Sequence, residues 1–156
     1  MMISIKWIIT DDLSNVSVEE FENEWNGIIG GYFELIVNQQ RVGSCPNREI
    51  EKGEEGLEDV LFWLIEFYRA LKKLKNGEVY EMTLITRNLY KLVLKKSEKI
   101  ELQYTKKETN EVDWEEVVEI QEFEQEINRN IEKFRSEIQY INPKLLTSKW
   151  IKKLEY

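Results

Sequence analysis

The segment from Leu57 to Leu74 is the most apolar continuous stretch of the chain, and it constrains the fold more than any other feature. Its apolar side chains recur at intervals of three and four residues, which is the spacing of one face of an α-helix. A stripe widened by flanking aromatic residues must be covered on more than one side. We therefore expect a central helix against which a sheet folds. The stripe consists of Leu57, Val60, Leu61, Leu64, Ile65, Tyr68, Leu71 and Leu74, and it is flanked by Phe62, Trp63 and Phe67.

Runs rich in β-branched and aromatic residues surround this helix and predict strands. Asn38-Gln39 stands where the second and third runs would form a hairpin turn. The last three runs are separated by connections short enough for antiparallel hairpins. Apolar and polar residues alternate along them, which indicates one buried and one solvated face. The expected strands span residues 3–10, 32–37, 40–44, 79–85, 89–95 and 99–105.

A capping-box pattern at Asp113 to Glu116 predicts the start of a second long helix. From Val117 to Ile141 the apolar residues keep a step of three or four, which is typical of a helix with one buried face. Two short helices complete the expected set, one from the capping box at Ser17 to Asn26-Gly27 and one from Asn142-Pro143 onward.

Strands and helices in this order do not alternate as parallel units, so an α+β fold is expected rather than a doubly wound one. We predict a single domain over residues 1–156, because the length suits one core and 42% of the residues are hydrophobic. It would contain one antiparallel β-sheet of about five to six strands, with the two long helices packed on one face.

The chain contains no histidine, which excludes Ser-His-Asp and Cys-His catalysis and removes the commonest metal ligand. Cys45 is the only cysteine, so no internal disulfide is possible and a reducing compartment is expected. The first ten residues lack the pattern of a secretory signal, and charges within the central helix argue against a membrane span. We expect a cytoplasmic protein with no catalytic residues, no cofactor, no bound metal and no membrane contact.

Acidic residues are concentrated in two parts of the chain, whereas the segment from Arg69 to Lys107 is basic. Between Met1 and Gln40 the only base is Lys6, and between Glu108 and Asn128 there is none. Solvated helix faces usually mix charges of both signs, so the second window suggests a surface that attracts a basic partner. The simpler interpretation, a solvated face with acids favoured by the helix dipole, remains open for each residue taken alone.

Two other interpretations are weaker. Pairs of carboxylates catalyse glycoside hydrolysis in some enzymes, but this chain offers many such pairs and no means of choosing one. Lysines and arginines between residues 79 and 107 would suit nucleic acid if Tyr90 and Tyr104 stacked on bases. A net charge of −8 disfavours that partner, so we expect no nucleic-acid binding.

Two tryptophans lie beside acidic residues at expected helix ends, where a partly exposed indole often anchors a partner protein. We expect Glu115, Glu119 and Glu122 to line one side of the second long helix, away from its buried stripe. The predicted partner-binding residues are Asp113, Trp114, Glu115, Glu119, Glu122 and Trp25.

Several segments resemble small bacterial immunity proteins of polymorphic toxin systems, of the contact-dependent growth inhibition type. The resemblance lies in Gly31 to Asn38, Val42-Gly43, Trp63-Leu64, Asn142 to Leu146 and Lys149 to Ile151. It implies a non-enzymatic cytosolic protein that binds and blocks a cognate toxin domain, often a nuclease. The alternative from another class is an accessory or scaffold protein that associates with itself through an apolar helix edge or sheet edge.

The composition generates a first prediction. Protein purified without chelators should contain no stoichiometric transition metal, because histidine is absent and no glycine-rich phosphate loop is present. Elemental analysis checks this prediction. One metal ion per chain would contradict it.

Overall fold

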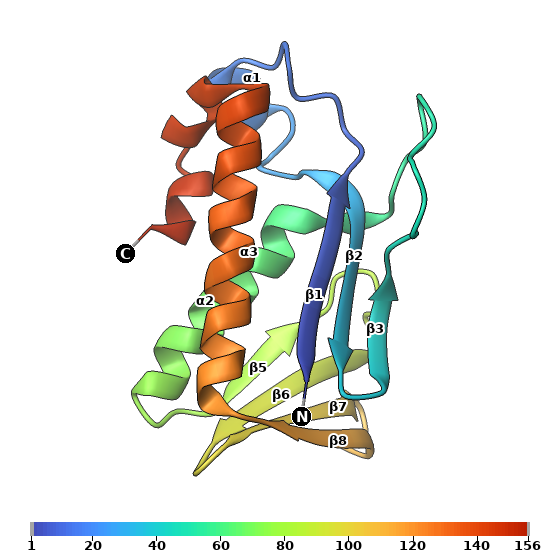
Figure 1. Cartoon of the computed structure of the whole chain (residues 1–156), viewed down its shortest axis with the longest axis vertical. Coiled ribbons are helices and arrows are strands. Elements are labelled where there is room, and N and C mark those ends of the chain that lie inside the picture. The colour runs from blue at the N-terminus through green and yellow to red at the C-terminus, as the bar shows by residue number, and fades with distance from the viewer. Residues whose placement is uncertain (1, 156) are drawn as a thin grey trace.

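A computed structural model describes residues 2–155 and shows an α+β fold built on two antiparallel sheets (Figure 1). The first sheet contains β1 (Ile3–Ile9), β2 (Gly30–Val37), β3 (Gln40–Ser44) and β4 (Glu58–Asp59), and the second contains β5 (Tyr80–Thr83), β6 (Tyr90–Lys96), β7 (Ile100–Lys106) and β8 (Val112–Val118). The helices are α1 (Val18–Asn23), α2 (Val60–Lys75) and α3 (Ile120–Ile141), followed by the 3₁₀ turns η1 (Pro143–Thr147) and η2 (Ile151–Leu154).

The prediction of one sheet of about five to six strands is wrong, because the described strands form two sheets of four. β1, β2 and β3 pair in sequence order, and β4 pairs with the first residues of β2. β5 to β8 pair in order as a separate meander. β3 does not continue into the meander, since Gly43 adopts a left-handed conformation (φ 83°) and Pro46 follows the strand. Periodicity predicts that a segment is a strand, but it does not predict which other strand it pairs with.

The helix α2 occupies the centre of the molecule, as its stripe predicts. Trp63 stacks on Phe33 of β2, with ring centroids 4.6 Å apart, and Phe67 meets Phe123 of α3 edge-to-face at 6.5 Å. These aromatic side chains join the first sheet, α2 and α3 in one core. Figure 1 shows α3 running alongside β1, with the second sheet lying across the base of the molecule. The two long helices therefore do not pack on one face of a single sheet.

The expected start of the central helix at Leu57 is wrong. Asp59 is the N-cap residue, and its side chain accepts a hydrogen bond from the Phe62 N–H at 3.1 Å. Leu57 precedes the two residues of β4 and is 86% exposed, so it does not belong to the buried stripe. At the other end, Lys72, Lys73 and Lys75 lie in the last turn, where positive charge favours the helix dipole.

The predicted helix start at Asp113 is also wrong, because residues 112–118 form the strand β8. Val118 faces the core, and pairing with β7 places Trp114 opposite Tyr104. A ladder of backbone hydrogen bonds and a segment rich in valine and tryptophan outweigh a four-residue capping pattern. The helix begins only at Ile120, after Glu119. From Phe123 to Ile138 its predicted stripe is buried as expected, and Ile141 at its end is partly buried.

The predicted end of the first short helix at Asn26-Gly27 is wrong, because α1 ends at Asn23 with Glu24 as its C-cap residue. Other predictions of local structure are confirmed. Ser17 and Glu20 form the capping box at the start of α1. Asn38 takes a left-handed conformation (φ 55°) in the turn between β2 and β3. The segment after Asn142-Pro143 is helical, although it consists of two 3₁₀ turns. The side chain of Asn142 donates to the carbonyls of Leu13 and Val16, which ties these turns to the loop before α1.

Two core side chains provide a test of the helix faces. Leu64 of α2 and Phe134 of α3 are both fully buried. Replacing either with alanine should lower the free energy of unfolding by about 2–5 kcal/mol, since each leaves a cavity in the packed core. Urea unfolding measures this loss. A variant with the same urea midpoint and slope as the parent would show that its helix face is wrongly placed.

Candidate functional site

The candidate site lies where the second sheet passes into α3. Asp113, Trp114 and Glu115 lie on β8, Glu119 is the N-cap residue of α3, and Glu122 lies in its first turn. The structure therefore brings five of the six predicted residues onto one continuous segment. We call these five residues the acidic edge. Figure 1 shows β8 leading directly into α3 at the base of the molecule.

The expected arrangement of Glu115, Glu119 and Glu122 along one side of a helix is wrong, since Glu115 lies on a strand. Side chains of a strand point alternately to its two faces. Trp114 lies on the face that continues into the core and Glu115 on the opposite, solvated face, whereas Asp113 is exposed at a β-bulge that interrupts the alternation. The indole of Trp114 and the carboxylate of Glu115 therefore project from opposite faces of β8.

Two lysines partly balance the acidic edge. Lys106 Nζ lies 3.8 Å from Asp113 Oδ1, and Lys99 Nζ lies 3.3 Å from Glu119 Oε1. These pairs are solvent-exposed and contribute little net stabilisation. Glu115 accepts a hydrogen bond from the amide of Gln103 at 2.9 Å, and Glu122 is exposed. The segment therefore keeps an excess of negative charge at its surface.

Trp114 ends a ladder of aromatic rings that crosses three strands. Tyr90 and Tyr104 stack with centroids 4.5 Å apart at 15°, and Tyr104 and Trp114 stack at 5.7 Å and 5°. Both faces of the Tyr104 ring are therefore occupied, which leaves no face of this ring for a nucleic-acid base. Burial raises the pKa of the Tyr104 hydroxyl. The sequence predicts that Tyr90 and Tyr104 lie on neighbouring strands, but it does not predict that their rings stack on each other.

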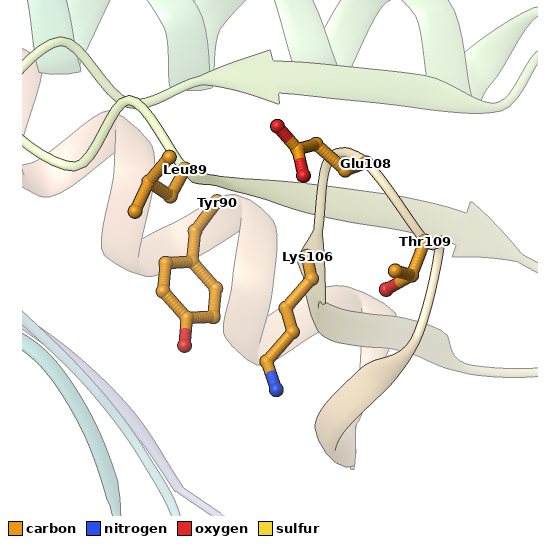
Figure 2. Close-up of a pocket in the computed structure, with 5 residues that line it drawn as sticks. All are labelled: Leu89, Tyr90, Lys106, Glu108 and Thr109. Atoms are coloured by element: carbon orange, nitrogen blue, oxygen red, sulfur yellow. The ribbon is translucent and has the colours of Figure 1, made fainter.

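A small hollow adjoins this ladder (Figure 2). It measures about 170 Å³ and is lined by Leu89, Tyr90, Lys106, Glu108 and Thr109. Figure 2 shows the side chains of Tyr90 and Lys106 extending side by side from neighbouring strands. The hollow is smaller than the pockets that enclose most small-molecule ligands.

Trp25 does not join the acidic edge. It follows the C-cap of α1, and Figure 1 places α1 and β8 at opposite ends of the molecule. Trp25 is half-buried and lines a separate hollow of about 290 Å³ with Asp11 and Ile28. Trp25 is therefore partly exposed, as expected. It does not share a surface with Trp114.

Other chemistry is sparse in the described part of the chain. Within residues 2–155, no three carboxylate or thiol side chains converge in an arrangement that could hold a metal ion. None of the described helices combines the length and apolar character needed to cross a membrane. Burial, with a smaller effect of Glu34, raises the pKa of the Cys45 thiol. A protonated thiol is a poor nucleophile.

No protein-family model matches this chain, and no curated protein or solved structure matches it either. The functional argument therefore depends on the surface of the chain itself. The acidic edge is its most distinctive part, because the window around it contains nine acidic residues and no base.

The stacked rings generate a prediction about this surface. Tyr104→Ala, Trp114→Ala and the double variant should form a non-additive cycle, because stacked pairs contribute about 0.5–1.5 kcal/mol beyond their buried area. Urea unfolding of the parent and the three variants measures the coupling. Strictly additive losses would show that the two rings do not interact in solution.

Proposed function

We propose that this protein binds and neutralises a basic toxin domain by forming a stoichiometric complex, as immunity proteins do. The single observation that carries the proposal is the acidic edge, an exposed strand and helix start with an excess of carboxylates around a half-buried tryptophan. Aromatic residues at the centre of a charged surface are typical anchors of protein interfaces. The resemblance of several segments to immunity proteins supports the same conclusion.

The chemistry of the surface favours a partner that itself binds nucleic acid. Enzymes that cleave DNA or RNA present lysines and arginines to the phosphate backbone. A surface with carboxylates on both β8 and α3 presents negative charge to such a partner in place of phosphates. Complementary charge of this kind speeds association and rejects partners of the wrong sign. The protein would act by occupying the partner's surface, without catalysis.

A specific observation also favours the alternative of self-association. Leu57, Ile85 and Leu89 are exposed by 86%, 55% and 66%, respectively. Leu57 and Ile85 adjoin in sequence the two residues of one hydrogen bond, in which the Thr86 hydroxyl donates to the Glu58 carboxylate at 2.9 Å. Exposed apolar residues gathered at one junction are a common feature of interfaces between protein chains. Sedimentation equilibrium distinguishes the two functions, since only self-association makes the mass of the purified protein depend on its concentration.

The test of the proposed function reverses charge on the acidic edge. Asp113, Glu115 and Glu122 are exposed, so changing all three to lysine should leave folding nearly intact. Association with the partner captured from the native cell should slow by roughly tenfold or more at low salt. The difference should shrink at 1 M salt, where the Debye length is about 3 Å. Stopped-flow or surface-based kinetics measures these rates, and titration should show one protein bound per toxin.

The matched control is a second triple reversal that changes the net charge by the same amount. Glu24, Glu55 and Glu132 are exposed and lie outside the acidic edge. Their replacement with lysine should alter the association rate much less. If both triple variants associate with the partner at the same rate, overall charge alone acts and the acidic edge is not the recognition surface.

A further inference from the structure

The two sheets have four outer edges, and the described structure protects three of them. On β1, the outward N–H of Ile5 donates to Glu126 Oε2 of α3 at 2.7 Å. On β5, the outward N–H of Thr83 donates to Glu66 Oε1 of α2 at 3.0 Å. On β3, the edge is interrupted by the left-handed Gly43. Charged side chains and irregular backbone are the usual means by which proteins block a sheet edge from pairing with another chain.

The edge formed by β8 is interrupted near its start by a β-bulge at Asp113, but its backbone is regular from Trp114 to Val118. Alternate residues of a strand form hydrogen bonds to opposite neighbours. Lys107 N–H donates to Leu89 O at 3.0 Å, and Lys106 N–H donates to Glu111 O at 2.9 Å, so even-numbered residues of β7 face β8. On the regular part of β8, the register then directs the N–H and C=O groups of Glu115 and Val117 away from β7.

A contact between β8 and the first sheet supports the assignment that the Val117 carbonyl points away from β7. Asn38 Nδ2 lies 3.5 Å from the carbonyl oxygen of Val117, at the end of the strand next to α3. Within residues 2–155, no strand pairs with the outer side of β8. Glu115 therefore presents its backbone N–H and C=O to solvent, and Val117 presents its N–H.

Charge decides which strand would pair with this edge. If β8 of a second copy paired with it antiparallel and centred on Glu115, the two Glu115 side chains would lie directly opposite each other. Like charges in that position are destabilising. Lysines in the same position would be attracted to Asp113 and Glu115, while apolar residues on the other face of the added strand would lie beside Trp114.

We propose that the outer edge of β8 receives an extended basic segment of the partner, which adds to the second sheet as a fifth strand. This proposal rests on the proposed function and specifies how the acidic edge binds. The added segment alternates lysine or arginine with apolar residues. Its backbone bonds to Glu115 and Val117, and its side chains contact the carboxylates on one face and Trp114 on the other. Strand addition of this kind takes its affinity from main-chain hydrogen bonds and its specificity from alternate side chains.

The probe for this proposal is a synthetic peptide of alternating lysine and valine, about ten residues long. On binding, the amide protons of Glu115 and Val117 should exchange with solvent at least roughly fivefold more slowly, because they become hydrogen-bonded. Hydrogen exchange followed by nuclear magnetic resonance measures each amide separately. A peptide of the same sequence with every backbone nitrogen methylated keeps the charge but provides no N–H donors, and it should bind much more weakly.

Two variants of one residue separate the backbone from the charge. Glu115→Ala and Glu115→Pro both remove the carboxylate, and only the proline also removes the outward N–H. Proline is tolerated at an edge position whose N–H faces solvent. Glu115→Pro should bind the peptide roughly threefold to tenfold more weakly than Glu115→Ala, which is the effect of one backbone hydrogen bond. If the proline variant does not fold, the exchange measurement on the parent protein gives the answer alone.

The outcomes separate this inference from the proposed function. Unchanged exchange at the amides of Glu115 and Val117, equal binding of the methylated peptide, or no binding of either peptide would overturn strand addition. If the charge-reversed triple variant nevertheless associates slowly with the toxin, the acidic edge still binds it through side chains. If that variant associates as fast as the parent while the peptide protects β8, the edge pairs with basic strands but does not recognise the toxin.

Discussion

One carboxylate joins the two sheets of this protein. Glu58 lies on β4, which belongs to the first sheet, and accepts hydrogen bonds from Thr86 at 2.9 Å and Arg87 at 2.6 Å, in the loop that connects β5 and β6. The indole N–H of Trp63 donates to the same carboxylate at 2.8 Å, and its ring stacks on Phe33. Because a buried charge is tolerated only when it is paired and hydrogen-bonded, these contacts hold the two sheets in one arrangement.

The separation into two sheets is also what creates the candidate site. A single sheet has two outer edges, whereas this architecture has four, and each must be protected or used. Glu126 accepts a hydrogen bond from an outward backbone N–H of β1, and Glu66 accepts one from β5. β8 is the edge whose outward backbone groups face solvent beside an aromatic ring. A β-bulge interrupts it at Asp113, and along the rest of the edge the charge of Asp113 and Glu115 repels a second copy and attracts a basic chain.

The same carboxylates therefore have opposite effects on different partners. Edge charges are a general means of preventing aggregation, and in that role they need no partner at all. A solvated strand usually mixes both signs, and here the bases nearest to β8 are Lys106 and Lys99, at its two ends. The excess of one sign over a whole strand and the following helical turn is the reason for proposing a partner in addition to this protective role.

The sequence by itself determined the local elements whose periodicity is strong, such as α2 and the stripe of α3 from Phe123 onward. It also identified the residues of the acidic edge, because charge is a property of composition. The tertiary structure alone decided that residues 112–118 are a strand, that β3 and β5 lie in different sheets, and that Tyr104 stacks between Tyr90 and Trp114. Periodicity reflects contacts between near neighbours along the chain. The pairing of Trp114 with Tyr104 and the bond from Asn38 to Glu116, across 78 residues, depend on which surfaces meet after the chain has folded.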